Sequence, residues 1–259
     1  MAETIAVLSL KGGTGKTTTV RTLADVFRRI GLDVLAVDLD PQGNLSDYFD
    51  VPPDASPTIA DVLSGDAKAK NAIHDGIVPA TPILAEVERS LSGKIGRELV
   101  LRKALRDARK DHDVILVDCP PALGLLTING LVAADWALIS SEAQYFALQG
   151  VQGALEVIEQ AKDFYNPDLE WLGVVMNIAD MRTVHSREAY AQLTEHYGDK
   201  VFKTVIRSSI AYAESAERAQ SILDHRPDLG ADYLALADEV LARIGLRDAR
   251  RALKPLLAS

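Results

Sequence analysis

The feature that most constrains this chain is a short apolar run ending in a glycine cluster near the N-terminus. Residues 4–10 are Thr-Ile-Ala-Val-Leu-Ser-Leu, and residues 11–18 are Lys-Gly-Gly-Thr-Gly-Lys-Thr-Thr. Apolar residues at helical spacing follow from Thr17 to Ile30, and Gly31 is placed to end that helix. A glycine-rich turn between a buried strand and a helix points successive backbone N–H groups at phosphate oxygens. The sequence therefore predicts a phosphate-binding loop.

Two residue types in this loop carry specific expectations. Lys16 is expected to reach the β- and γ-phosphates of a nucleotide, and the Thr17 hydroxyl to ligate Mg²⁺. The ordinary pattern has glycine at position 10, but Leu10 stands there, and a second lysine, Lys11, heads the loop. A plain strand-to-helix turn is the alternative, which Gly-Lys-Thr-Thr argues against. The nucleotide-binding residues predicted from the loop are Lys11, Gly12, Gly13, Thr14, Gly15, Lys16, Thr17 and Thr18.

Strands and helices alternate along the rest of the chain. Apolar runs predict strands at 34–37, 114–117, 136–140, 172–176 and 201–206. Helical spacing is found near 97–110, 124–133, 146–164, 184–197 and 229–244. The proline-rich residues 50–96 predict small helices with an extra strand at a sheet edge. We expect a single α/β domain over residues 1–245, a mostly parallel twisted sheet with helices on both faces, followed by a basic, helical tail at 246–259.

Carboxylates at the ends of two expected strands complete the predicted site. Asp118 ends the strand Val-Ile-Leu-Val, where it can hold Mg²⁺ through water, although a helix N-cap is the plainer interpretation. Asp38 and Asp40 follow the neighbouring strand, and ligands of such sheets bind beyond the strand ends. We expect Asp40 to orient or activate the attacking water. Asp38 is expected to be a structural or Mg²⁺-linked partner, with a simple Asx turn as the alternative.

Composition limits the cellular setting. No stretch of about 18 apolar residues occurs, so we expect neither a membrane span nor a signal peptide, and a cytoplasmic protein. The single cysteine, Cys119, cannot form an intrachain disulfide and is expected to be a small core side chain. The five histidines lack metal-ligand spacing, so the only metal expected is one that arrives with a nucleotide. A net charge of −9 leaves only a local patch for any nucleic-acid contact.

These motifs together resemble the ParA/MinD family of deviant Walker P-loop ATPases. The runs Asp118-Cys-Pro-Pro-Ala-Leu-Gly-Leu-Leu-Thr-Ile-Asn129 and Glu142-Ala-Gln-Tyr-Phe-Ala-Leu-Gln-Gly150 are similar to ParA-type, Soj-like partition ATPases rather than to MinD. The similarity covers roughly residues 4–207. With no helix-turn-helix extension expected at the N-terminus, the chain resembles the short form of the family.

The resemblance implies a P-loop NTPase fold and slow hydrolysis of ATP to ADP and phosphate with Mg²⁺. It also implies an ATP-dependent sandwich homodimer, in which Lys11 reaches across to the partner's phosphates. The family's ATP-bound dimer binds DNA without sequence preference, and an adaptor protein stimulates hydrolysis and release. The catalytic residues that we expect on this basis are Lys11, Lys16 and Asp40.

The sequence departs from the family pattern after the last strand. ParA proteins carry a Pro-Arg-Asn-Val-Arg-like run there, whereas residues 207–211 are Arg-Ser-Ser-Ile-Ala. Surface arginines nearby could contact phosphates instead, or could simply be solvated. The DNA-binding candidates are Arg182, Arg187, Arg207, Arg218 and Arg226.

Base selection is expected to depend on Asn177. The run Asn177-Ile-Ala-Asp180 follows a strand and faintly resembles the Asn-Lys-x-Asp guanine reader of GTPases, but the lysine is missing. We therefore expect Asn177 to contact adenine and Asp180 to be a turn residue.

The basic tail has three possible roles. Basic and apolar residues of 243–256 fall on different helix faces, as in the membrane-binding tails of MinD-like relatives. The apolar face has no aromatic residue, and Pro255 interrupts its end, so we expect no membrane partner. A DNA-contacting tail and a helix packed on its own or a partner subunit are the remaining alternatives.

The leading hypothesis is a cytoplasmic, nucleoid-associated ATPase that drives partition or positioning of a plasmid, chromosome or protein cargo. One alternative is a MinD-like, membrane-associated spatial regulator. Another is a metabolic enzyme that uses ATP to activate a small substrate, as amidoligase relatives of this fold do. The sequence identifies neither the cargo nor the adaptor.

Overall fold

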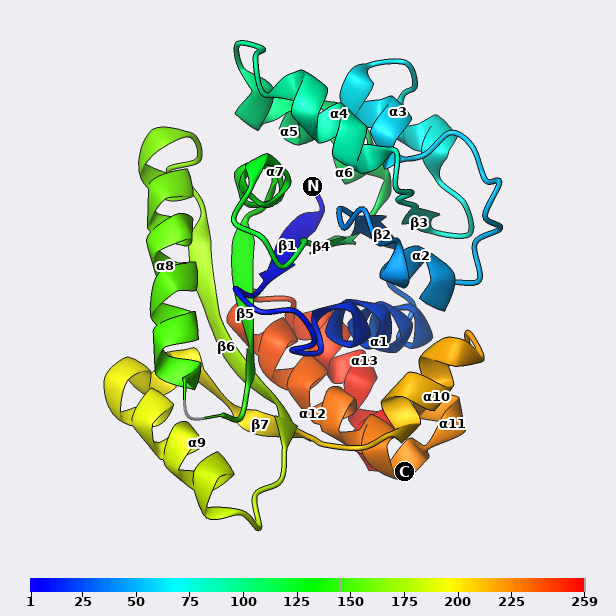
Figure 1. Cartoon of the computed structure of the whole chain (residues 1–259). Coiled ribbons are helices and arrows are strands. Elements are labelled where there is room, and N and C mark those ends of the chain that lie inside the picture. Colours follow the sequence, from blue (N-terminus) through cyan, green and yellow to red (C-terminus); the bar gives the residue numbers. More distant parts are fainter. Residues whose placement is uncertain (145, 259) are drawn as a thin grey trace.

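Seven strands form one sheet in the computed structural model, which describes residues 1–144 and 146–258 (Figure 1). Within this part of the chain the strand order is β3-β2-β4-β1-β5-β6-β7, and all neighbouring strands are parallel. The strands are β1 (Glu3–Leu8), β2 (Val34–Asp38), β3 (Ile77–Val78), β4 (Val114–Asp118), β5 (Trp136–Glu142), β6 (Glu170–Ala179) and β7 (Val201–Arg207).

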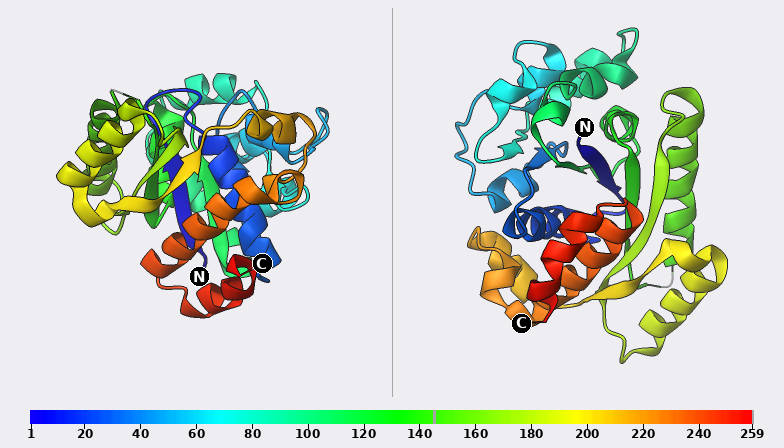
Figure 2. Two further views of the ribbon diagram at one scale, coloured as in Figure 1. Left: turned by 90° about the horizontal axis from the view of Figure 1, so that it is seen from below. Right: turned by 180° about the vertical axis from the view of Figure 1, so that it is seen from behind.

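Helices cover both faces of this sheet (Figures 1 and 2). One face carries α3 (Ile59–Ser64), α4 (Leu84–Leu91), α5 (Val100–Ala104), α6 (Ala108–Asp111), α7 (Leu125–Ala133), α8 (Ala147–Phe164) and α9 (Val184–Tyr197). The other carries α1 (Lys16–Arg29), α2 (Asn44–Tyr48), α10 (Ala211–Glu217), α11 (Ile222–His225), α12 (Pro227–Arg243) and α13 (Arg247–Leu257). Short 3₁₀ turns are η1 (Ala69–Ala72), η2 (Arg97–Leu99) and η3 (Gly198–Lys200).

The sheet separates two hydrophobic clusters. In β1, Ala6 and Leu8 belong to the cluster beneath α8, whereas Ile5 and Val7 belong to the cluster beneath α1 and α12. This follows because successive side chains of a strand point to opposite faces, so a sheet covered on both sides needs continuous apolar strands. The predicted α/β fold with helices on both faces is confirmed.

The topology brings the ends of four strands together. β1 lies between β4 and β5, and β4 lies between β1 and β2. The register pairs Val7 with Asp118 and Asp38 with Asp118, so both aspartates stand at the carboxyl edge of the sheet beside the turn that follows β1. Ligands of open α/β sheets bind at this edge.

The segment with helical spacing near 97–110 is helical, and the structure divides it into η2, α5 and α6. The buried amide of Asn129 explains the irregular start. Its Nδ2 donates to Arg97 O at 2.9 Å, and its Oδ1 accepts from Leu101 N at 3.1 Å. These two backbone groups would bond to each other in a continuous α-helix. The side chain of α7 therefore replaces one helical hydrogen bond.

Residues 50–96 fold as small helices and one edge strand, as predicted. The short β3 pairs with β2 at one edge of the sheet. Helix α3 begins at a capping box, in which Thr58 N donates to the Asp61 carboxylate at 2.7 Å.

The tail forms helix α13, which packs against α12. Leu253 is fully buried there, and Arg250 makes a two-point ion pair with Asp238 of α12. Pro255 lies within the last turn of α13. Across the described residues, no helix combines the length and the apolar composition that a membrane span needs.

Candidate nucleotide site

The turn between β1 and α1 has the shape of a phosphate cradle. Gly13 and Gly15 have φ angles of 75° and 82°, which only glycine adopts without strain. A Cβ on Gly15 would also lie 3.3 Å from the side chain of Asn177. Glycine at position 15 is therefore required both by the backbone and by the close approach of β6. The turn leads directly into Lys16, the first residue of α1.

Lys16 lies buried at the base of this turn. Its Nζ donates to Ser9 Oγ at 3.0 Å, and Thr14 Oγ1 donates to the same atom at 3.0 Å. Ser9 in turn donates to Lys11 O at 2.7 Å. Ser9 thus holds both ends of the turn, a role that our sequence analysis missed although the residue directly precedes the loop. The Lys16 ammonium group thus donates to the neutral Ser9 hydroxyl, and an anionic phosphate could take the place of this acceptor.

A metal site of the expected kind fits Thr17 and Asp118. The Thr17 hydroxyl donates to Asp118 Oδ2 at 2.7 Å, while the buried Oδ1 has no hydrogen-bond partner among the described residues. Burial and then the nearby charge of Asp38 raise the pKa of Asp118 to about 8. A divalent cation at this place would satisfy the free oxygen and favour the ionised carboxylate.

Asp38 and Asp40 differ in their burial and in their hydrogen-bond partners. Asp38 is fully buried, and its oxygens accept from Asp40 N at 3.0 Å and from the Ser46 backbone N and hydroxyl at 3.0 and 2.8 Å. Burial raises the pKa of Asp38 to about 6. Asp40 lines the pocket described next, and its Oδ1 accepts from Gln42 N at 3.0 Å, as in an Asx turn. Asp38 thereby orders the loop that carries Asp40.

A pocket of about 760 Å³ lies beside the glycine-rich turn. Residues 12–18 line one part of it, and Asn177 lies at its buried side. Asn177 Nδ2 donates to Ser140 Oγ at 2.7 Å and to Thr19 Oγ1 at 3.3 Å, so both amide hydrogens are used. Its Oδ1 is buried without a partner among the described residues. Asn177 therefore keeps one hydrogen-bond acceptor that no described residue satisfies.

Three tyrosines that our sequence analysis missed line the same pocket. They come from separate elements, Tyr48 from α2, Tyr212 from α10 and Tyr233 from α12. The rings of Tyr212 and Tyr233 meet edge to face with centroids 6.0 Å apart. Their wide separation in sequence left no local signal. Together they give the pocket a wall of aromatic rings, the tyrosine wall.

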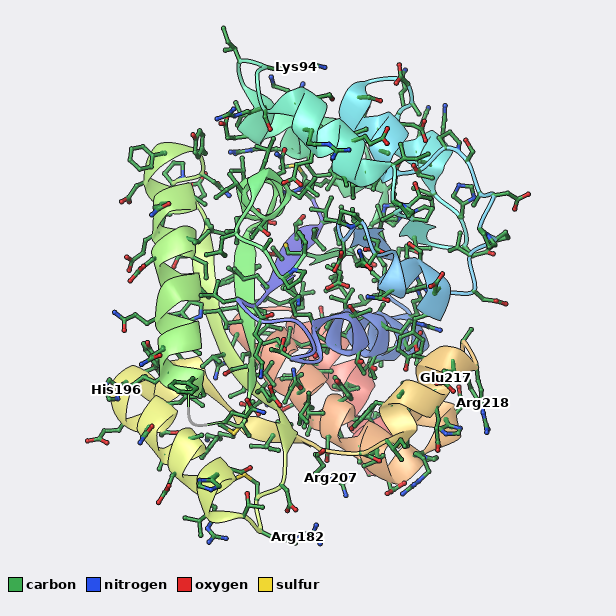
Figure 3. The ribbon with its side chains drawn as sticks, in the orientation of Figure 1. Lys94, Arg182, His196, Arg207, Glu217 and Arg218 are labelled. Carbon is green, nitrogen blue, oxygen red and sulfur yellow. The ribbon has the colours of Figure 1, made fainter. Side chains whose placement is uncertain are left out.

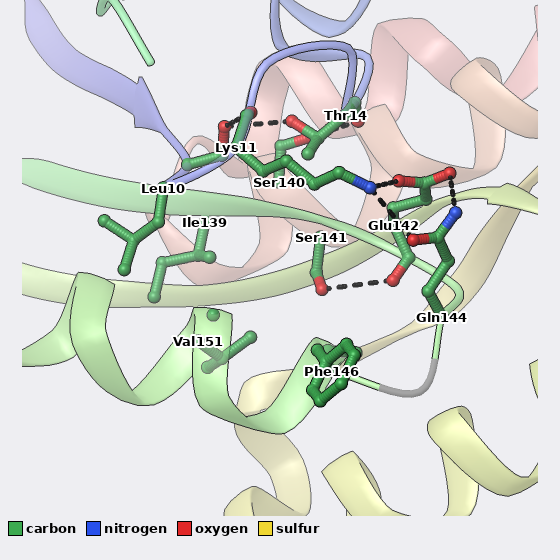
Figure 4. A pocket seen from close by; sticks show the side chains of 13 residues that line it. Leu10, Lys11, Thr14, Ile139, Ser140, Ser141, Glu142, Gln144, Phe146 and Val151 are labelled. Atoms are coloured by element: carbon green, nitrogen blue, oxygen red, sulfur yellow. Dashed lines mark hydrogen bonds and ion pairs between the residues drawn. The ribbon is translucent and has the colours of Figure 1, made fainter. Parts of the chain in front are cut away.

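Lys11 stands at the open head of the turn, with 62% of its side chain exposed. Its Nζ lies 2.8 Å from Glu142 Oε2 and 2.9 Å from Gln144 Oε1 (Figure 4). These residues belong to the run 142–150, whose Tyr145 lies outside the described residues. The resemblance drew attention to this run but did not predict the contact with Lys11.

The arginines proposed for DNA contact lie after β6, in α9, at the end of β7, after α10 and after α11. Figure 3 shows Arg182, Arg207 and Arg218 along the lower rim of the molecule. Arg182 is paired with Asp180 at 2.8 Å, and Arg207 with Asp232 at 2.9 Å.

The remaining two arginines are held close to the chain as well. Arg226 pairs with Asp228 at 2.8 Å. Arg187 donates to the carbonyl oxygens of Met181 and Arg182. Three of the five arginines, Arg182, Arg207 and Arg226, are therefore paired with aspartates.

Cys119, which directly follows Asp118 in the sequence, is fully buried. A Cβ on Gly130 of α7 would lie 2.7 Å from its Sγ, so the thiol fills the space beside a glycine. Burial raises the pKa of this thiol above its ordinary value. The expectation of a small core side chain fits this environment.

Comparison with known proteins identifies the family. The AAA domain family matches residues 2–171. The chromosome-partitioning ATPase Soj of Thermus thermophilus is 40% identical over 246 residues, covering 93% of this chain and 96% of Soj. A structure titled cobyrinic acid a,c-diamide synthase of Mycobacterium smegmatis, with bound ADP and magnesium, has a TM-score of 0.77 at 35% identity and covers 87% of this chain and 95% of that one.

A second solved structure extends the likeness to MinD. The septum site-determining protein MinD of Pyrococcus horikoshii, complexed with Mg-ADP, has a TM-score of 0.76 at 26% identity, covering 93% of this chain and 96% of MinD. A family match over more than half of the chain and a near full-length relative agree with the glycine-rich turn, Lys11 and the buried aspartates. The chain belongs to the ParA/MinD family of deviant Walker P-loop ATPases.

Proposed function

We propose that this protein is a ParA-like switch that binds ATP with Mg²⁺ and forms an ATP-dependent sandwich homodimer. The dimer binds nucleoid DNA without sequence preference and positions a plasmid, chromosome or protein cargo. An adaptor protein stimulates the slow hydrolysis of ATP and thereby releases the dimer. The single observation that carries this proposal is Lys11, an exposed lysine beside a nucleotide pocket that already has its own buried lysine, Lys16.

The residues of one chain have distinct tasks in this reaction. The backbone of residues 12–18 and Lys16 hold the phosphates, and the partly buried Asp40 orients the attacking water. Thr17 and Asp118 would hold Mg²⁺, which neutralises charge on the β- and γ-phosphate oxygens. Asp38 keeps the Asp40 loop in place through its bonds to Asp40 N and Ser46.

In this proposal the unpaired amide oxygen of Asn177, Oδ1, selects the base of the nucleotide. Adenine carries an exocyclic amino group that can donate to this oxygen, whereas guanine presents a carbonyl oxygen at the same place. The tyrosine wall would pack against the base. These features support ATP as the substrate.

The substitution Lys11→Ala tests the dimer directly. We expect ATP binding within about fivefold of wild type, because exposed ionic contacts contribute little. ATP-dependent dimerisation and turnover should be lost, as measured by light scattering on a sizing column and by phosphate release. Lys162→Ala, which removes an exposed lysine at the far end of α8, is the control. A normal dimer fraction and hydrolysis rate in Lys11→Ala would contradict the proposal.

Arg182, Arg207 and Arg226 can bind DNA only if the DNA phosphates displace the aspartates that pair with these arginines. Filter binding of nonspecific DNA should appear with ATP, vanish with ADP and fall steeply with salt. Arg226 and Asp228 are both exposed, at 50% and 55%, and pairs of this kind contribute little and are readily exchanged. Arg207 is 50% exposed but its partner Asp232 only 16%, so we expect this pair to be exchanged less readily.

The two alternatives predict different ligands. A membrane regulator of the MinD kind would need the apolar face of α13, but Leu253 of this face is fully buried, and Ala249 and Leu256 pack against the same hydrophobic cluster. A metabolic amidoligase would hydrolyse ATP in response to a small carboxylic acid substrate and an ammonia source rather than to DNA and an adaptor. Co-sedimentation with anionic liposomes tests the first alternative. Hydrolysis assays with cobyrinic acid and glutamine test the second.

A further inference from the structure

Strand β6 contains one extra residue where it ends beside the glycine-rich turn. Its pairing with β7 advances by three residues, from Met176 to Ala179, while β7 advances by only two. One residue too many on one strand of a pair is a β-bulge. On the other side of β6, the pairing with β5 runs in register from Gly173 to Asn177. The extra residue is therefore Ile178.

The backbone of Ile178 lies in the left-handed region, with a φ angle of 54°. Glycine is the usual residue at such a bulge position, because a Cβ crowds the following carbonyl oxygen. Side chains that branch at Cβ tolerate this conformation least. The other non-glycine residues with positive φ in the described part of the chain are Asp50, Asp75 and Ala219, and none of these is branched at Cβ. The backbone at Ile178 is therefore strained.

The bulge changes the face of the sheet on which Ile178 lies. Side chains of a strand alternate, so Val175 belongs to the cluster beneath α1 and α12, and Met176 to the cluster beneath α8. Asn177 follows this alternation and donates to a hydroxyl of α1 at 3.3 Å. Continued alternation would place Ile178 with Met176, but Ile178 lines the nucleotide pocket together with Asn177. The alternation resumes at Ala179, which lies on the Met176 side.

Neighbouring strands hold the bulge in this conformation. The carbonyl oxygens on both sides of Ile178 are bonded, since Asn177 O accepts from Ala143 N at 3.2 Å and Ala179 O accepts from Ser208 N at 3.1 Å. Ile178 itself remains 38% exposed. Burial of an apolar side chain in the core therefore does not account for a strained backbone at this position.

We propose that the bulge presents Ile178 as an apolar contact for the base of the bound nucleotide. This inference rests on the nucleotide binding of the proposed function but requires neither the dimer nor DNA. Ile178 directly follows Asn177, so a base that bonds to Asn177 lies within reach of the next side chain. Covering Ile178 with a flat ring removes apolar surface from water. The nucleotide-free chain thus gives up some stability to hold a side chain that the ligand covers.

Ile178→Ala tests the contact with the base. It should weaken the binding of ATP and of ADP by the same factor, about three- to tenfold, because both ligands carry the base. Binding of inorganic tripolyphosphate with Mg²⁺, which has no base, should stay unchanged. Ile178→Leu keeps the apolar bulk without the branch at Cβ and should bind ATP within about twofold of wild type. Competition against a fluorescent ATP analogue measures all three ligands.

Ile178→Gly tests the strain when it is compared with Ile178→Ala in nucleotide-free protein. In an ordinary strand, glycine is less stable than alanine. Here Ile178→Gly should unfold about 2–4 °C above Ile178→Ala, because glycine adopts the left-handed conformation without strain. Ala219→Gly is the matched control, since Ala219 also has positive φ but lies outside the residues that line the pocket. It should raise the Tm above that of wild type and leave ATP binding unchanged.

The outcomes separate this inference from the proposed function. Absence of ATP binding in the wild type overturns the proposed function, whereas the thermal comparison still reports on the strain. Unchanged ATP affinity in Ile178→Ala, or an equal loss for tripolyphosphate, overturns the contact with the base. A lower Tm in Ile178→Gly than in Ile178→Ala overturns the strain.

A further variant covers the case in which both small variants are unfolded. Ile178→Thr keeps the branched shape and replaces part of the apolar surface with a hydroxyl. Weaker ATP binding with unchanged tripolyphosphate binding in Ile178→Thr supports the proposal, and unchanged ATP binding overturns it.

Discussion

At the scale of single residues, the site is marked by buried polar atoms that lack partners. Asn177 Oδ1 and Asp118 Oδ1 are both buried and unpaired among the described residues. Such atoms each cost about 1–3 kcal/mol of folding free energy. Two unpaired acceptors at one sheet edge fit a site whose remaining bonds are completed by a nucleotide and its metal.

Asn177→Leu tests the assignment of base selection. Removing the free acceptor should weaken ATP binding by about two- to tenfold and lower the preference for ATP over GTP, because one hydrogen bond to the base is lost. Competition of unlabelled ATP and GTP against a fluorescent ATP analogue measures both.

A second buried asparagine provides the control. Asn166 donates to two backbone carbonyls remote from the pocket, so Asn166→Leu should reduce stability and leave the ATP-to-GTP ratio unchanged. Equal displacement by GTP and ATP in the wild type would count against the role of Asn177.

At the scale of elements, local sequence predicts most strands and helices. Apolar runs and turn residues are local signals, and they predict where the six long strands lie along the chain. Near 97–110 they predict helical structure but not its division into η2, α5 and α6, because the amide that replaces a helical hydrogen bond there comes from Asn129, which is distant in sequence. The same reason explains which residues of the candidate site could be predicted from the sequence and which could not. Lys16, Thr17 and Asp118 belong to motifs, whereas the tyrosine wall and the contact of Lys11 with Glu142 depend on the packing of separate elements.

Helix α13 offers a prediction about stability. Leu253 is fully buried against α12, so Leu253→Ala should lower the free energy of unfolding by about 2–5 kcal/mol. Urea denaturation followed by circular dichroism measures the change. Arg251→Ala, at a residue 76% exposed, should change stability by less than about 0.5 kcal/mol. Equal effects of the two substitutions would show that α13 does not pack stably on α12.

This packing also affects how membrane binding should be tested. A chain ending at Ile244 would lose Leu253 from the core and expose the face of α12 that α13 covers. Any change in liposome binding could then reflect unfolding. Charge reversal of the exposed Arg251 leaves the core intact and is the better variant for co-sedimentation.

At the scale of the whole molecule, the chain carries a net charge of −9 and gathers several arginines along one rim. Aspartates from the same loops and from α12 neutralise much of that rim. Binding of a polyanion to such a surface depends on a small balance between arginine and aspartate. Substitutions of the aspartates should therefore be as informative about DNA binding as substitutions of the arginines.

Asp228→Asn and Arg226→Glu should change DNA binding in opposite directions. Freeing Arg226 should strengthen ATP-dependent binding of nonspecific DNA by about three- to tenfold at 0.1 M salt and steepen the salt slope by about one contact, and Arg226→Glu should weaken it. Filter binding across a salt series measures both. Asp163→Asn, on α8, changes the net charge equally without touching the rim. An effect of Asp163→Asn equal to that of Asp228→Asn would mean that net charge alone is responsible.

Because Cys119 is buried, we expect the native chain not to react with thiol reagents. Reaction with a maleimide needs an accessible thiolate, and this thiol is both enclosed and held protonated by burial. A cysteine introduced at the fully exposed Ile95 would then be the only site to take a dye. Energy transfer between two such chains could follow assembly and release in real time, with every native residue of the nucleotide site left unchanged.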